Sequence, residues 1–128
     1  MPASSANLGI AGLELPNFSI RPVPDESELV FQVSGNGDMA AIEPLTRYLK
    51  GVHAEALRLG AAVVRLDVRE LYFLNSSCLK SLLSWVSQLA SDATPAYRVA
   101  FVTSPQLHWQ RRSLEALRRL APQVVTLS

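Results

Sequence analysis

Residues 63 to 86 read VVRLDVRELYFLNSSCLKSLLSWV, and they hold the strongest fold signal in the chain. The apolar run from Ala61 to Val68 is short and nearly continuous, which indicates a central strand covered on both faces. The apolar residues further along recur at the spacing of three and four that is typical of a helix: Leu79, Leu82, Leu83, Val86 and Ala90. Residues 69 to 77 connect the two elements, so the polar residues 75 to 77 and Cys78 lie at a strand-to-helix junction.

The rest of the chain continues this alternation of strands and helices. SGNGD at 34 to 38 is interpreted as a turn, Pro44 fits the first turn of a helix, and Gly60 ends that helix. The other elements are expected as strands at 17 to 23, 28 to 34, 97 to 103 and 123 to 127, with helices at 41 to 59 and 105 to 121. The order β-β-α-β-α-β-α-β predicts a single α/β domain with a mostly parallel sheet over residues 17 to 128. Residues 1 to 16 are expected to form a loose leader.

Composition and charge exclude several classes of function. The 128 residues carry a formal net charge of only +1, so no overall field favours nucleic acid or an anionic membrane surface. No apolar run approaches the roughly 18 residues of a membrane-spanning helix, so we expect no membrane insertion. The single cysteine cannot form an internal disulfide, and no secretory signal is recognised before Arg21, the first basic residue. We therefore expect a cytoplasmic protein.

The sequence offers little for metal or cofactor chemistry. His53 and His108 lie in predicted helices and have no carboxylate three or four residues away, so we expect packing or surface roles for them. No glycine-rich phosphate loop with its lysine is present. The arginines between 111 and 119 flank Glu115 at helical spacing, as on a solvated face. We therefore expect this protein to have no cofactor, no metal ion, no contact with nucleic acid and no catalytic residue.

The stretch from 63 to 86 resembles the signature of STAS domains, the family of bacterial anti-sigma factor antagonists. That signature is an apolar strand ending in Leu-Asp, then an apolar residue and Phe, and then Asp-Ser-Ser-Gly-Leu opening a helix. The match runs without a gap from Val63 to Leu83. LVFQVSGNGD at 29 to 38 is similar to the family's earlier strand and Gly-x-x-Asp turn, which places Gly35 and Asp38.

The resemblance implies a β-α superhelix that acts as a non-enzymatic binding switch. It implies a protein partner, either a serine kinase or an anti-sigma factor, and a serine phosphatase if the chain is phosphorylated, with a monomer or weak dimer as the assembly. By its match to the family position, Ser76 is the expected phosphoacceptor, and Ser77 is the second choice. The sequence departs from the family signature at two positions that bear on binding of the kinase partner. Asn75 replaces the family's Asp and lacks its charge, and Cys78 replaces the family's Gly.

Physical chemistry also points to the strand-to-helix junction. Ligands of open α/β sheets gather at the carboxyl ends of strands, and the first N–H groups of a helix are unpaired and partly positive. A serine at that position is also a good helix cap, and Ser77 is the expected one. Trp85 borders a polar stripe of the second helix, where it is either an exposed anchor for a partner or packed on a neighbouring helix or the leader. The expected partner-binding residues are Asp38, Asn75, Ser76, Ser77, Lys80, Ser81, Ser84 and Trp85.

Three other functions stay open at this point. One is an accessory or scaffold subunit of a transport complex, in which the transporter is a separate chain. Another is a constitutive docking domain that keeps the family's surface without phosphorylation. The third is a cysteine-dependent enzyme that uses Cys78, for which the sequence offers no base and no oxyanion site. Asp67 matches a further family position and has either a structural or a functional role.

Overall fold

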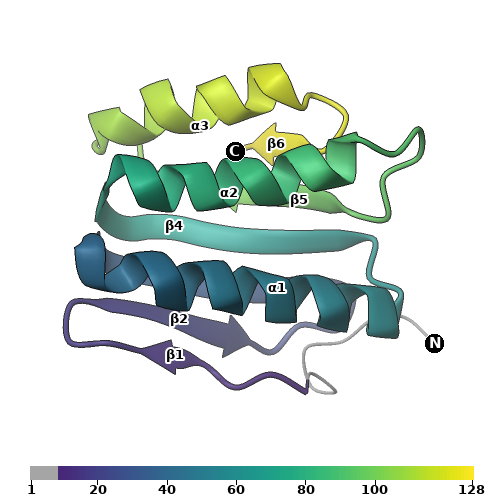
Figure 1. Ribbon diagram of the computed structural model, residues 1–128, viewed down its shortest axis with the longest axis horizontal. Helices are drawn as coiled ribbons and strands as arrows, with labels where there is room; N and C mark the ends of the chain where they lie inside the picture. The colour runs from purple at the N-terminus through teal and green to yellow at the C-terminus, as the bar shows by residue number, and fades with distance from the viewer. Residues whose placement is uncertain (1–8) are drawn as a thin grey trace.

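The computed structural model describes residues 9 to 128, which form one sheet with helices packed against it (Figure 1). The elements are β1 (Leu13–Glu14), β2 (Phe18–Val23), β3 (Leu29–Gly37), the one-turn helix η2 (Met39–Ala41), α1 (Ile42–Leu59), β4 (Val63–Leu74), α2 (Ser76–Ala90), β5 (Arg98–Val102), α3 (His108–Leu120) and β6 (Val125–Leu127). This order is the predicted one, with β1 and η2 added. The predicted α/β fold class is confirmed.

The strands of the described residues lie side by side in chain order, from β1 to β6. The pairs β1–β2 and β2–β3 are antiparallel, whereas β3–β4, β4–β5 and β5–β6 are parallel. Every right-handed crossover therefore advances in the same direction along the sheet, which puts α1, α2 and α3 on one face (Figure 1). The expectation that the central strand is covered on both faces is wrong, because none of these helices lies on the other face.

The core forms between the helices and the covered face of the sheet. On β4, the buried residues Val64, Leu66 and Val68 alternate with the less buried Arg65 and Asp67, as strand geometry requires. On α2 the buried side differs in part from the predicted stripe, because Leu79, Leu83 and Ala90 are only partly buried at its edge. The fully buried residues of α2 are Cys78, Leu82, Trp85, Val86 and Leu89.

Two strands run further than the sequence pattern predicts. β4 continues to Leu74, so residues 69 to 74 are strand rather than connection. β3 continues to Gly37, so the interpretation of residues 34 to 37 as a turn is wrong. The reason is that β3 and β4 pair with each other along this extension. Gly35 makes this possible with a φ of 96°, and a Cβ there would lie 2.2 Å from the carbonyl oxygen of Asn17.

Residues 9 to 16 pack against the domain, although they were expected to belong to a loose leader. β1 pairs with β2 within this segment, and Ile10 lies against α1. A Cβ on Gly51 would approach Ile10 Cδ1 to 2.8 Å, so the glycine inside α1 provides the room that this segment needs. The expectation is wrong for residues 9 to 16, and residues 1 to 8 lie outside the described part of the chain.

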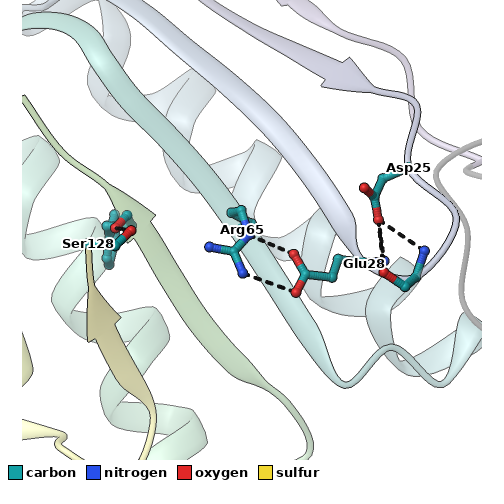
Figure 2. A network of polar contacts seen from close by, with 6 residues as sticks. Asp25, Glu28, Arg65 and Ser128 are labelled. Carbon is teal, nitrogen blue, oxygen red and sulfur yellow. Dashed lines mark hydrogen bonds and ion pairs between the residues drawn. The ribbon is translucent and has the colours of Figure 1, made fainter.

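The face of the sheet opposite the helices carries a charged network (Figure 2). The guanidinium of Arg65 on β4 donates to both carboxylate oxygens of Glu28, at 2.6 and 3.0 Å. Asp25 accepts hydrogen bonds from the backbone N–H groups of Ser27 and Glu28, and these bonds hold the pKa of its carboxyl below the usual value. The network fixes the connection between β2 and β3 against the central strand.

Candidate functional site

β4 and α2 meet at Asn75, which is the N-terminal cap of α2. Its backbone N–H donates to the carbonyl oxygen of Gly37 at the end of β3 (2.8 Å), and its side-chain Oδ1 accepts from the N–H of Cys78 (2.8 Å). The expectation that Ser77 caps the helix is therefore wrong, since Ser77 lies within the first turn. Asn caps a helix about as well as Asp, so Asn75 supplies the same local geometry without a negative charge.

Replacing Asn75 with Ala is expected to lower the free energy of unfolding by about 0.5 to 2 kcal/mol, because the N–H of Cys78 loses its acceptor. Ser77→Ala is the matched control at an exposed position that does not supply the cap, and it should change this energy by less than about 0.5 kcal/mol. Urea unfolding measures both variants. A larger loss for Ser77→Ala than for Asn75→Ala would contradict the assignment of the cap.

Ser76 and Ser77 are the first two residues of α2, and both are exposed. Because Asn75 supplies the cap, neither hydroxyl is needed to close the helix. The partial positive charge of the helix N-terminus favours an anion at this position, and the exposed Lys80 lies one turn further along. The arrangement thus offers hydroxyls that an enzyme can reach and a position where a phosphate group is tolerated.

Cys78 is fully buried beneath this junction. Its thiol donates a weak hydrogen bond to the backbone carbonyl of Asp38, with the sulfur 3.7 Å from the oxygen. Burial and, to a smaller extent, the charge of Asp38 raise the pKa of the Cys78 thiol above its usual value. A thiolate nucleophile needs a low pKa and access to its substrate, so the geometry argues against an enzyme built on Cys78.

The buried thiol is expected to react with iodoacetamide at pH 8 at least about tenfold more slowly in the folded protein than in urea. The physical reason is that folding both raises the pKa of Cys78 and removes its sulfur from solvent. Intact-mass measurement over time gives both rates on the same single-cysteine chain. Equal rates in the folded and unfolded states would show that the thiol is accessible and would contradict this placement.

Asp38 lies next to the junction, immediately after β3. Its side chain accepts a hydrogen bond from the N–H of Ala40 at 3.1 Å and caps the η2 turn. The structure therefore brings Asp38, Asn75 and the two serines of α2 to the same end of the parallel strands. This is the end at which open α/β sheets bind their ligands.

Asp67 does not belong to this group of residues, because it lies on the face of the sheet that no described helix covers. The guanidinium of Arg69 donates to its carboxylate at 3.0 and 2.7 Å, and the backbone N–H of Arg69 donates at 3.1 Å. The guanidinium bonds, together with the weaker effect of the backbone bond, hold the pKa of the Asp67 carboxyl below its usual value. Of the two roles left open by the sequence, this geometry favours the structural one.

The polar stripe of α2 is only partly available to a partner. Ser84 is exposed, but the Ser81 hydroxyl lies 2.7 Å from Thr46 Oγ1 on α1. Trp85 is only 5% exposed, and its indole N–H donates to the Tyr97 hydroxyl at 2.7 Å. The interpretation of Trp85 as an exposed anchor is wrong, because its side chain is buried in the fold, with Tyr97 before β5 as its hydrogen-bonding partner.

An apolar rim that was not predicted from the sequence lies near the start of α2. Met39, Tyr72 and Phe73 are 83%, 58% and 49% exposed, although each is a large apolar or aromatic side chain. Phe73 pairs with Asn36 at the end of β3, and Met39 opens η2 just after it, so the rim borders the junction of β4 and α2. Exposed apolar residues that gather at one place mark interaction surfaces. The consecutive apolar residues Tyr72, Phe73 and Leu74 are the sequence signal that would have found part of this rim.

Comparisons with known proteins assign the fold. No family model matches the sequence, and no curated protein matches it. Similar solved structures include an anti-sigma factor antagonist from Mycobacterium paratuberculosis, with a TM-score of 0.63, 21% identity and coverage of 86% of this chain and 88% of that one. The phosphorylated form of the Bacillus cell fate determinant SpoIIAA gives a TM-score of 0.52 at 19% identity, covering 87% of this chain and 90% of that chain.

A third similar structure is a DUF3478 protein from Shewanella loihica that is described as having a SpoIIAA-like fold. It has a TM-score of 0.57 at 18% identity, with 91% of this chain and 88% of that one covered. The chain therefore has the SpoIIAA-like fold of STAS domains, as the residues between 63 and 86 predict. At these identities the likeness concerns the fold.

Among residues 9 to 128, no helix has the length and apolar content that crossing a bilayer requires. In the same range, His, Cys, Asp and Glu side chains nowhere come together in a group of three or more that could hold a metal ion.

Proposed function

We propose that this chain is a regulatory protein-binding domain of the anti-sigma factor antagonist type, switched by phosphorylation of Ser76. The observation that carries the proposal is an exposed hydroxyl at the start of α2 beside the apolar rim of Met39, Tyr72 and Phe73. The partner is a serine kinase or anti-sigma factor, with a serine phosphatase to restore the free hydroxyl. The fold shared with anti-sigma factor antagonists supports this class of partner.

A phosphate on Ser76 would act on the bound partner rather than on the fold. It adds about −1.5 to −2 charge, which the N-terminus of α2 tolerates. A partner seated on the apolar rim would instead have to bury a strongly hydrated group next to Phe73 and Met39, at a cost of several kcal/mol. Phosphorylation is therefore expected to release the partner and to leave the domain folded.

Affinity capture with the whole chain, followed by intact-mass analysis and phosphopeptide mapping, tests the proposed function. The expected result is a bound protein kinase or anti-sigma factor and a phosphate that maps to Ser76. Capture of transport components without any phosphate would favour the accessory-subunit function instead. A partner that binds equally well when no serine is ever modified would leave a constitutive docking domain.

A double substitution tests whether the apolar rim contributes to partner binding. Replacing both Met39 and Phe73 with Ser is expected to weaken partner binding about tenfold or more, since apolar side chains in the centre of an interface carry much of its energy. Leu57→Ser is the matched control, because Leu57 is also an exposed apolar side chain but lies near the other end of α1. Binding is measured by calorimetry with the captured partner. Equal affinities for the double variant and the wild type would place the interface elsewhere.

A further inference from the structure

Helices α1 and α2 lie side by side on the covered face of the sheet (Figure 1), and a groove of about 320 Å³ opens between them. Leu49 and Trp85 provide its apolar surface. The remaining lining side chains are polar: Thr46, Lys50, His53, Ser81, Ser84 and Gln88. A groove of this volume is at the small end of the range found for ligand sites, which is roughly 300 to 1,000 Å³.

A chain of hydrogen bonds behind the groove connects Trp85, Tyr97 and His53. The Trp85 indole N–H donates to the Tyr97 hydroxyl, because an indole nitrogen can only donate. The Tyr97 hydroxyl lies 2.7 Å from His53 Nδ1, and its own proton is free for that contact. In the tautomer in which His53 Nδ1 accepts from Tyr97, the ring proton is on Nε2. That tautomer gives the groove an imidazole N–H donor.

Each exposed polar side chain of the groove can donate a hydrogen bond. Lys50 contributes an ammonium group, and Ser84 and Gln88 contribute a hydroxyl and an amide, on side chains that are exposed to solvent. Thr46 and Ser81 bond to each other across the two helices and mark one end of the groove. None of the lining residues is acidic, so the only formal charge in the lining is positive. Such a set of donors matches the oxygens of an anion.

We propose that the groove between α1 and α2 binds a small organic molecule that carries an oxyanion, either a phosphate monoester or a carboxylate. Lys50, His53 Nε2–H and Ser84 would hold the oxyanion, and Leu49 and Trp85 would contact the organic part. The site is distinct from the serines at the start of α2, and its ligand would bridge two helices that pack on the same strands. Binding there does not depend on modification of Ser76.

Titration followed by ¹H–¹⁵N NMR tests the site, with phenyl phosphate and benzoate as the two probes. The expected result is saturable shifts of the Trp85 indole N–H, with at least one probe binding, and the stronger probe identifies the oxyanion. Lys50→Gln should weaken that binding at least about tenfold, because it removes the only full charge of the groove. Arg112→Gln is the control, because it removes one positive charge from an exposed residue on α3 outside the groove, and it should leave the affinity unchanged.

Two results would overturn the proposal. One is the absence of saturable shifts with both probes, and the other is equal weakening by Lys50→Gln and Arg112→Gln, which would indicate attraction by net charge alone. Long-range ¹H–¹⁵N correlation of the His53 ring provides an independent readout that needs no ligand and no variant. The expected spectrum is that of a neutral ring with its proton on Nε2, and a proton on Nδ1 would remove the donor on which the site depends.

Discussion

Leu82→Ala is expected to lower the free energy of unfolding by about 2 to 5 kcal/mol, the range found for buried Leu→Ala changes. Leu82 is buried on the inner side of α2, among the residues that pack against the sheet. Truncation removes apolar surface from the core and leaves a cavity that the rigid central strand cannot fill by moving. A loss of this size is a large part of the total stability of a small domain.

Chemical denaturation at constant temperature measures this loss directly. Leu120→Ala is the matched control. It deletes the same side-chain atoms, but at a surface position on α3, where Leu120 is 66% exposed. It should change the free energy of unfolding by less than about 0.5 kcal/mol. Equal effects of the two substitutions would mean that α2 does not present Leu82 to the sheet, and the assignment of its buried side would fail.

The fold could be predicted because its signals are local and repeated. The inward residues of β4 alternate with Arg65 and Asp67, and each predicted helix shows an apolar stripe at spacings of three and four. The absence of helices on the other face of the sheet is a consequence of strand order, which is set by long-range pairing. The alternating charges at Arg65 and Asp67 were the available sign that one face of this strand is open.

The candidate site could be predicted in its place along the chain but not in its detailed roles. Asn75, Ser76 and Ser77 are consecutive, and all three types of side chain cap helices well. The choice among them depends on where the last residue of β4 pairs with β3, because the bond from the Asn75 N–H to Gly37 fixes the start of α2. A shift of one residue in that pairing would give a different cap, and no local pattern determines it.

The orientation of the Trp85 side chain is another feature that the local sequence does not determine. It stands at the boundary between the apolar and polar stripes of α2, so helix periodicity allows either orientation. The acceptor that draws its indole N–H inward is the hydroxyl of Tyr97, which approaches only because β5 lies next to β4. Tertiary packing therefore decides which hydrogen-bond partner a side chain such as Trp85 finds. The same Tyr97 hydroxyl also contacts His53, which lines the polar groove.

Ser76→Asp is expected to weaken binding of the protein partner about ten- to a hundredfold, which corresponds to about 1.4 to 3 kcal/mol. This expectation rests on the proposed function, since the partner would have to cover a carboxylate at the edge of the apolar rim. Ser76→Asp should not destabilise the folded domain, because Ser76 is exposed in the first turn of α2. A negative charge there contributes about 0.3 to 1 kcal/mol of stabilisation. The melting temperature is therefore expected to stay the same or to rise slightly.

Ser76→Asn separates the effect of charge from the effect of size, because Asn has nearly the shape of Asp and is neutral. Its binding should stay within a few-fold of wild type if charge is what releases the partner, and calorimetry with both variants measures the difference. Ser77→Asp gives the second comparison, since Ser77 is equally exposed and only one residue away. A greater loss of binding for Ser77→Asp than for Ser76→Asp would move the switch to Ser77. If Ser76→Asp and Ser76→Asn both bind as wild type, the junction of β4 and α2 carries no switch, and the surface around Phe73 is a constitutive docking site.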